Sequence, residues 1–297
     1  MLAVVVVWAG AFAAIKALLD HGVAAEDIAV LRYLVAAPGF AVLLWRTGGL
    51  PGLSAPDGLR VLTAGALVVA GYHISLNIGE RSTTAGTAAL VVALAPAMTV
   101  ALALAFRLER FSAPRMLGLG VAFAGVAVVV LLGSGEEISF ENAKGPLIVL
   151  GAPLSFALYN VLLLPLFGRY GVLALTAATS LCGMIALAPF ARRSTVETFV
   201  DSSAGDLLLV LYLGVVCTLL GYIGWNVGLR GLGASRAVAY AYGIPPLAVA
   251  IGAVTLHEPV TIWLALGGLL VVGGVALAQG TVGRWRRRQR RLASPVS

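Results

Sequence analysis

Charged side chains are scarce in this chain. Lysine, arginine, aspartate and glutamate make up 11% of its 297 residues, whereas 60% of the residues are hydrophobic. Soluble domains carry about 25% charged residues, so the composition excludes an ordinary water-soluble protein. The mean hydropathy of +0.99 indicates a chain whose main solvent is lipid.

Cysteine and histidine are also rare, with two and three residues. Cys182 and Cys217 lie inside apolar runs, and no CxxC or Cys/His spacing suggests a metal site, so we interpret both as buried small hydrophobic side chains. No GxSxG, HExxH or phosphate-binding glycine motif is present. We therefore expect no catalytic residues, no metal and no cofactor, and the protein is not predicted to be an enzyme. A channel is disfavoured as well, because neither a ring of pore-lining charges nor a carbonyl filter is recognisable.

Apolar segments of about 18 residues or more recur along the whole chain. Each is long enough, at about 1.5 Å per residue, to cross a hydrocarbon core about 30 Å thick as a helix. Barrel strands would alternate apolar and polar residues, and these segments do not. The first begins at Leu2 without a basic leader, so a removed signal peptide is not expected. We count ten predicted spans, at about 2–19, 28–45, 60–78, 85–106, 115–132, 146–167, 172–190, 207–227, 234–255 and 260–279.

The chain is a duplicated unit, because distinctive residues recur at a constant displacement of 149 positions. The recurring pairs are Asn77/Asn226, Gly79/Gly228, Arg81/Arg230, Pro96/Pro245 and Glu109/Glu258. Each unit holds five spans, an odd number, so the second unit must enter the bilayer from the opposite side. The predicted fold is an all-α membrane protein with ten transmembrane helices in two inverted five-helix repeats. The predicted organisation is a first repeat at 1–133, a connecting loop at 134–144, a second repeat at 145–282 and a basic cytoplasmic tail at 283–297.

The positions of the basic residues predict the orientation. A cytoplasmic N-terminus puts fourteen of the twenty basic residues on the inner side, in agreement with the positive-inside rule. Six of these are the arginines of the tail sequence RWRRRQRR, which we expect to bind anionic lipids of the inner leaflet rather than nucleic acid. The others are Arg46, Arg60, Arg107, Arg110, Arg115, Arg169, Arg230 and Arg236. We predict an integral protein of the plasma (inner) membrane with both termini in the cytoplasm.

Two segments resemble a known family. Residues 220–277 begin LGYIGWNVGLRGLG and continue through Pro245 to Glu258, and they resemble the second repeat of the EamA type of the drug/metabolite transporter superfamily. WAGAFAAIKALLDHG at 8–22, followed by LRYLVAAP, resembles the opening of its first repeat. The resemblance implies a ten-helix carrier of small metabolites, often an exporter, with a central cavity between the repeats. The chain departs from the family's usual glycine-glutamate pair before helices five and ten, where it reads LER and LHEP.

Polar and aromatic residues deep in the spans are the candidates for the substrate cavity, since inverted carriers bind substrate near the midplane between their repeats. These candidates are Trp8, His73, Tyr159, Asn160 and Tyr222. His73 and Tyr222 occupy equivalent positions of the two repeats. The cavity is expected to be largely apolar and aromatic, which suits amino acids, nucleobases or amphipathic drug-like solutes.

His73 is also the candidate for coupling transport to protons, because an imidazole titrates near neutral pH. A neutral histidine bonded to a neighbouring helix is the alternative. Asn160 could bind substrate or bridge two helices by a hydrogen bond. Trp8 could instead belong to the aromatic belt at the membrane surface, although it lies about ten residues below the outer end of its span.

Lys16 and Arg32 lie toward the outer ends of their spans. Their long side chains are expected to reach the water, where Asp20, Glu26 and Asp27 offer partners, and Lys16 and Asp20 have the i,i+4 spacing of a helical ion pair. This anchoring role is favoured over the alternative, in which the two cations bind an anionic substrate.

The repeated charges and prolines are candidates for gating. Arg81 with Glu258 on the outer side, and Arg230 with Glu109 on the inner side, could form two ion pairs related by the repeat. Ordinary roles at helix ends are the alternative for these residues. Pro96 and Pro245 are expected to kink spans four and nine, either as bending points or as static packing features. The small residues Gly118, Ala122, Gly125, Gly267, Gly268, Gly273 and Gly274 are expected to let spans five and ten pack closely.

Together these patterns predict a secondary active transporter that moves a small organic metabolite by alternating access, with outward transport as the favoured direction. Protons are the candidate coupling ion. A non-transporting polytopic membrane protein, such as a receptor or an assembly partner, is the alternative.

Overall fold

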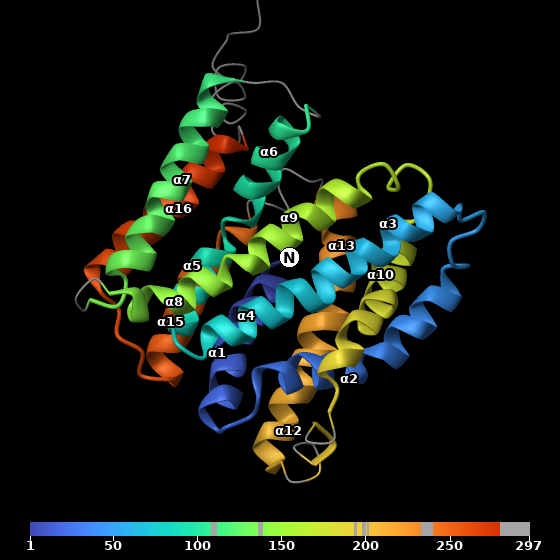
Figure 1. Ribbon diagram of the computed structural model, residues 1–297, viewed down its shortest axis with the longest axis horizontal. Helices are drawn as coiled ribbons and strands as arrows, with labels where there is room; N and C mark the ends of the chain where they lie inside the picture. Colours follow the sequence, from blue (N-terminus) through green and yellow to red (C-terminus); the bar gives the residue numbers. More distant parts are fainter. Residues whose placement is uncertain are drawn as a thin grey trace, which may run out of the picture.

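The computed structural model describes residues 1–107, 112–135, 139–192, 195–197, 200, 202–232 and 240–279, and every regular element in these ranges is helical. The predicted all-α class is confirmed for this part of the chain (Figure 1). The first half contains α1 (Leu2–Asp20), α2 (Ala25–Arg46), α3 (Ala55–Gly65), η1 (Ala66–Gly71), α4 (Tyr72–Glu80), α5 (Ala85–Val92), α6 (Ala95–Ala105) and α7 (Ala113–Leu132). The second half contains α8 (Phe140–Val149), α9 (Gly151–Leu163), α10 (Val172–Leu187), η2 (Ala188–Phe190), α12 (Ala204–Leu211), η3 (Tyr212–Leu220), α13 (Gly221–Leu232), α15 (Ile244–Thr255) and α16 (Ile262–Ala278).

Eight helical stretches of the described chain are long and apolar enough to cross a membrane. They are Leu2–Asp20, Ala25–Arg46, Ala55–Glu80, Ala85–Ala105, Ala113–Leu132, Phe140–Leu163, Val172–Phe190 and Ala204–Gly228. The predicted ninth and tenth spans contain the shorter apolar helices α15 and α16, of 12 and 17 residues. The first part of the predicted ninth span and the basic tail lie outside the described residues. Eight of the ten predicted spans thus correspond to helices with the length and composition that a membrane span needs, and the inverted ten-helix arrangement stays a prediction.

The third span of each half contains a π-helical segment, η1 in the first half and η3 in the second. Their positions are equivalent, because residues 66–71 displaced by 149 become residues 215–220 of η3. A π turn is rarely tolerated without a functional reason, and it rotates the side chains that follow it. His73 and Tyr222 each lie two residues after the end of η1 or η3, so the same irregularity sets the direction of both side chains.

The sequence predicts that Pro96 and Pro245 kink continuous helices. In the structure neither proline lies inside a continuous helix. Each occupies the first turn of a helix, α6 or α15, that starts after a short break in the span. The missing backbone donor of proline is harmless there, because the first N–H groups of a helix have no intrahelical partner. The predicted pair of kinks is thus a pair of breaks at equivalent positions.

Helices α7 and α16 pack against each other along their length and join the end of the first half to the end of the second (Figure 1). A Cβ atom on Gly274 would overlap the backbone nitrogen of Ala122, and one on Gly125 would lie 2.6 Å from the backbone nitrogen of Val271. The predicted close packing is confirmed at these glycines and at Gly118 and Gly267. Gly268 instead faces Leu90, and Gly273 faces open space.

Two further glycines at equivalent positions bring the halves together. Gly65 meets the backbone of Thr179 and Gly183 on α10, and Gly214, at the same position of the second half, meets Arg32 and Val35 on α2. Each third span therefore crosses the second span of the other half at a residue without a side chain. Close approach of backbones through small residues is the usual means of helix association in lipid.

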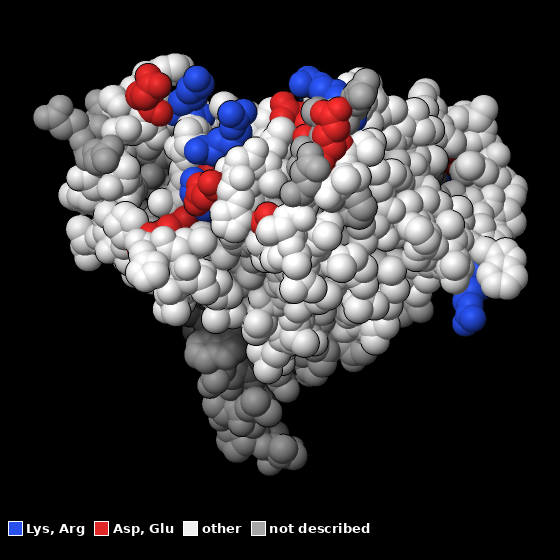
Figure 2. Space-filling model, turned by 90° about the horizontal axis from the view of Figure 1, so that it is seen from below, with Lys and Arg blue, Asp and Glu red and all other residues white. Residues whose placement is uncertain are grey.

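The exterior is largely uncharged. Figure 2 shows charged side chains gathered along one edge of the molecule, above a broad surface of neutral side chains. Large apolar side chains such as Leu34, Val42 and Leu269 are exposed on the described surface. Such a surface would aggregate in water, whereas it is the expected exterior of a bundle surrounded by lipid.

The tight crossing of α7 and α16 can be tested with a matched pair of variants. We expect Gly274→Ala to lower the thermal stability of the purified protein in detergent by several degrees, because the new methyl group meets backbone that cannot move aside. Gly273→Ala adds the same methyl group where no atom lies within 4 Å, and it should leave the melting temperature unchanged or raise it. Equal melting temperatures for the two variants would contradict this packing.

Candidate functional site

A cluster of aromatic and polar side chains lies between helices of both halves, and we call it the central cluster. It draws on α1, α2 and α4 from the first half and on α9, η3 and α13 from the second. Its side chains are Trp8, Arg32, Tyr33, Phe40, Tyr72, His73, Phe156, Tyr159, Thr218, Tyr222 and Trp225.

The rings form a chain of contacts from one half to the other. Trp8 lies edge-on to Tyr222, with ring centroids 6.1 Å apart, and its indole nitrogen donates to the carbonyl oxygen of Cys217 at 2.9 Å. The ring centroids of Tyr72 and His73 are 4.8 Å apart, and those of Phe156 and Tyr159 are 5.8 Å apart. The structure thus brings together four of the five side chains predicted for the cavity.

Asn160 is the exception among those five. Its amide nitrogen donates to the carbonyl oxygen of Phe156, one turn earlier in the same helix, at 2.9 Å. This bond connects no second helix, so the predicted bridge between helices is not found at this nitrogen. Asn160 is half-buried, and a role in substrate binding stays a prediction.

His73 is 2% exposed and contacts two residues of α2. Its Nε2 atom lies 3.1 Å from the hydroxyl of Tyr33, and its Nδ1 atom lies 3.5 Å from Nη1 of Arg32. Because a guanidinium can only donate, Nδ1 must accept and Nε2 must carry the proton, which it then donates to the Tyr33 oxygen. This is the arrangement of a neutral histidine bonded to a neighbouring helix. A proton added to Nδ1 would place two positive charges side by side.

Arg32 corrects one expectation from the sequence. Its side chain does not extend to the outer water but turns into the central cluster, where it is 6% exposed and its Nε atom donates to the hydroxyl of Thr218. In the described part of the chain no carboxylate lies within ion-pair distance of it. An ionisable residue inside a span is a functional-site candidate by default, and that rule would have singled out Arg32.

Lys16 behaves as the sequence predicts. Its ammonium group lies 3.1 Å from the carboxylate of Asp20, one turn later in α1. Asp20 is about half exposed in its side chain (53%), so this ion pair sits at the end of the bundle. The expected i,i+4 pairing is confirmed.

The predicted outer ion pair is not formed in this structure. The carboxylate of Glu258 accepts from the backbone N–H groups of Ala85 and Gly86, at 2.7 and 3.3 Å, and so caps the N-terminus of α5. Arg81 is exposed and makes no ion pair with Glu258. Glu109 and the side chain of Arg230, the predicted inner pair, lie outside the described residues.

Another set of polar contacts does occur at equivalent positions of the two halves. Asp57, at the start of α3, contacts Arg169 at 2.8 Å and Arg60 at 2.9 Å. Asp206, its counterpart at the start of α12, contacts His21 at 2.7 Å. Each aspartate thus connects the start of a third span with the residues that follow the first span of the other half.

The same local sequence builds both contacts. Ser54 and Ser203 are the N-caps of α3 and α12, and each hydroxyl accepts from the backbone N–H of the aspartate three residues later. A serine cap followed by an acidic residue at the third position is a strong signal for a helix start. The displacement of 149 positions makes Asp57 and Asp206 equivalent, but the sequence analysis did not predict their partners.

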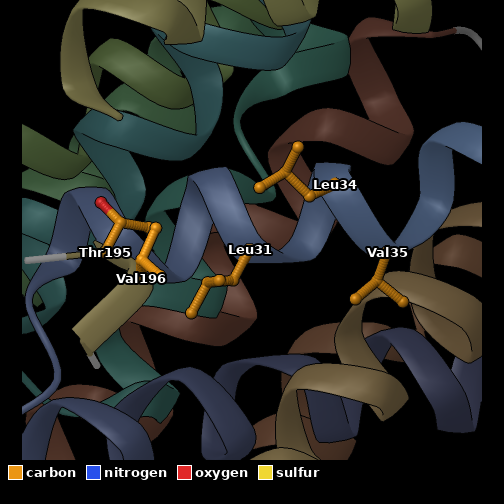
Figure 3. A pocket seen from close by; sticks show the side chains of 5 residues that line it. All are labelled: Leu31, Leu34, Val35, Thr195 and Val196. Atoms are coloured by element: carbon orange, nitrogen blue, oxygen red, sulfur yellow. The ribbon is translucent and has the colours of Figure 1, made fainter. Parts of the chain in front are cut away.

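Two depressions of the described surface lie elsewhere. One, of about 290 Å³, is lined by apolar side chains of α2 and of a neighbouring segment, and Figure 3 shows Leu31, Leu34, Val35, Thr195 and Val196 around it. Another, of about 350 Å³, lies near Arg169 and Tyr170. Neither touches the central cluster. A solute site needs a few convergent polar groups in an apolar setting, and the central cluster provides these whereas the apolar depression does not.

Among the described residues, no three histidine, cysteine, aspartate or glutamate side chains converge on a possible metal position.

The comparisons with known proteins agree with this architecture. The model of the EamA-like transporter family matches residues 1–131 and again residues 143–279. An uncharacterized transporter of Archaeoglobus fulgidus is 31% identical, with 90% of this chain and 93% of that protein covered. A probable terminal-alkyne amino-acid exporter of Streptantibioticus cattleyicolor is 30% identical, with 95% and 93% covered.

A solved crystal structure shares the fold. It superposes with a TM-score of 0.59 over 99% of this chain and 96% of the other, at 22% identity. The family match over both halves and the two full-length relatives show that the resemblance noted in the sequence is one of descent. The chain belongs to the EamA-like transporter family, and it is a membrane transporter by family.

Proposed function

We propose that this protein is a secondary transporter that moves a small amphipathic carboxylate, of the amino-acid class, through the central cluster. The observation that carries the proposal is Arg32, a buried cation without a carboxylate partner in the described chain, which contacts His73 of the first half and Thr218 of the second. A buried charge is costly unless it is paired, so the site favours a ligand that brings the missing negative charge. The rings of Trp8 and Tyr222 offer the apolar contact for the rest of the solute.

The relatives support the same class and direction. The Streptantibioticus cattleyicolor protein is named as an amino-acid exporter, and the match to it covers nearly the whole chain. An amino acid carries a carboxylate for Arg32 and a side chain for the aromatic surface. Outward movement of such a solute is therefore the direction that we propose.

The two halves are proposed to be inverted repeats that give alternating access. Equivalent residues make equivalent contacts with the opposite half, as Gly65 and Gly214 do in the packing and Asp57 and Asp206 in the polar contacts. In the inverted arrangement the contact between Asp57 and Arg169 lies on the cytoplasmic side, and the contact of Asp206 lies on the outer side. Opening one contact while the other holds would expose the central cluster to one side at a time.

The membrane setting is part of the proposal. The protein is expected in the plasma (inner) membrane with both termini in the cytoplasm, and the arginine tail is expected to bind anionic inner-leaflet lipids. A non-transporting receptor or assembly partner is the competing function. It would show no movement of solute in a reconstituted system.

Solute flux tests the proposal and the role of Arg32 together. Proteoliposomes with the full chain should exchange at least one member of a panel of radiolabelled neutral amino acids that includes propargylglycine, an amino acid with a terminal alkyne. Arg32→Gln should reduce the exchange about 10-fold to 100-fold, the range expected for losing a charge-assisted hydrogen bond. Arg46→Gln removes an equal charge from an exposed side chain and is the control. Equal rates for the wild type and Arg32→Gln would contradict the assignment of the carboxylate site.

The orientation is tested by cysteine labelling. In a variant that lacks Cys182 and Cys217, a single cysteine at His21 should react with a membrane-impermeant maleimide added to intact cells. A single cysteine at Arg169, the corresponding place in the other half, should react only after the cells are opened. Both side chains are more than half exposed, so access to the reagent is not limited by packing. Labelling of both positions from the same side would refute the inverted arrangement.

The role of His73 is tested by its neutral replacement. The sequence-based hypothesis of proton coupling at His73 stays a prediction, and it requires His73→Gln to abolish transport driven by a pH gradient. The contact with Arg32 favours the other outcome, in which His73→Gln weakens exchange but leaves its dependence on the gradient intact. The ratio of gradient-driven uptake to exchange at equal pH separates the two roles.

A further inference from the structure

Glu80 is the last residue of α4, and it has an unusual environment. Its side chain is fully buried, with 0% exposure. Neither carboxylate oxygen has a hydrogen-bond partner among the described residues. A carboxylate that is buried without a donor is among the least stable arrangements in a protein interior.

The nearby charges do not compensate for this burial. Lys16 attracts a negative charge on Glu80, but Asp20 and Glu258 repel it. The ammonium group of Lys16 is already paired with Asp20, and Glu258 is held by the backbone of α5. Lys16 is thus the single cation for Asp20 and Glu80, and Glu258 adds a further negative charge. This balance of charges, together with burial, favours the neutral, protonated form of Glu80.

Among the described residues, the other helices packed on α4 contribute no compensating cation at this end, and Arg81, the next residue in the chain, is exposed. Asp27 of α2 accepts from the hydroxyl of Thr195, and Arg32 is engaged with Thr218 and His73. Glu141 and Lys144 of α8 are exposed, and Glu26 of α2 is partly exposed.

A second buried oxygen completes the arrangement. Oδ1 of Asn77 also has no partner among the described residues, while its amide nitrogen donates to the carbonyl oxygen of Ala25 at 2.9 Å and fixes the side chain. Asn77 and Glu80 are three residues apart on α4 and share one helix face. Protonation would give Glu80 a hydroxyl donor on the helix face that carries this unpartnered oxygen.

The position of Glu80 connects the central cluster with the end of the bundle. His73, Asn77 and Glu80 follow one another at i, i+4 and i+7, so they form one buried polar stripe along α4, with 2%, 1% and 0% exposure. The end of the stripe at Glu80 lies near Lys16 and the half-exposed Asp20. A small movement of α1 against α4 would bring water to Glu80.

We propose that Glu80 is the proton-binding site of this protein. Glu80 holds one proton while it is buried, as in this structure, and releases the proton when the end of the bundle around Glu80 opens. On release the O–H bond of the carboxylic acid breaks, the proton passes to water, and the carboxylate is stabilised by that water and by Lys16. Recharging by a proton from water reverses the step. The use of this proton in transport rests on the proposed function, whereas the binding of the proton does not.

Infrared spectroscopy of the purified full-length protein tests the binding itself. At neutral pH the wild type should show the C=O stretching band of a protonated carboxylic acid, and this band should be lost in Glu80→Gln. Asp20→Asn is the matched control, since it removes a neighbouring carboxyl group that is exposed and ion-paired, and the band should persist there. Glu80→Asp should shift the band rather than remove it, which identifies the site if Glu80→Gln folds poorly. Absence of the band in the wild type, or its persistence in Glu80→Gln, would overturn the proposal.

Flux measurements then test coupling with the amino acid that exchanges best. A solute coupled to one proton can accumulate about tenfold for each pH unit of gradient. Glu80→Gln should retain exchange at equal pH within about twofold but lose all accumulation driven by the gradient, and accumulation that survives in Glu80→Gln would overturn the coupling. If no amino acid moves even in the wild type, the transport proposal fails, and the infrared result alone decides whether Glu80 binds the proton.

Discussion

Hydrocarbon offers no hydrogen bonds, and every polar group placed in it must find its partner within the protein. This constraint explains why the described chain is entirely helical and why nearly all of its buried polar side chains have identifiable partners. It also gives the exceptions their meaning. Among the described residues, Arg32 is buried without a counter-charge in the central cluster, and Glu80 is buried without any donor on the polar stripe of α4. In a lipid-embedded bundle such groups are the places where a solute or a proton can supply what the protein does not.

The duplication is visible in packing as well as in sequence. Both third spans carry a π-helical segment, and both cross the second span of the opposite half at a glycine, Gly65 or Gly214. The serine caps that precede Asp57 and Asp206 place two polar contacts at equivalent positions. Because these features recur, each half makes equivalent contacts with the opposite half. A two-state carrier needs such paired contacts, because closing one side must be compensated by opening the other.

Much of this could be predicted from the sequence, because the strongest signals in it are physical. Long apolar runs predicted the spans, and depth within them predicted four residues of the central cluster. Contacts that depend on side-chain direction could not be predicted. Arg32 lies near enough to the end of its span to reach water, and only the position of Thr218 on η3 shows that it turns inward. Glu258 was expected to pair with a charge, whereas the nearby N-terminus of α5 provided better donors. The burial of Glu80 could not be predicted either, since it depends on helices far away in the chain.

The pairing of α7 with α16 also determines the order in which the protein can be completed. Helix α7 is synthesised well before α16, yet the glycine surface of α7 fits that later helix. Until α16 arrives, the first half must wait in the membrane with that surface facing lipid or an insertion factor. The bundle can therefore close only after α16 has been made, and a chain truncated before Ile262 would lack the helix that packs against α7.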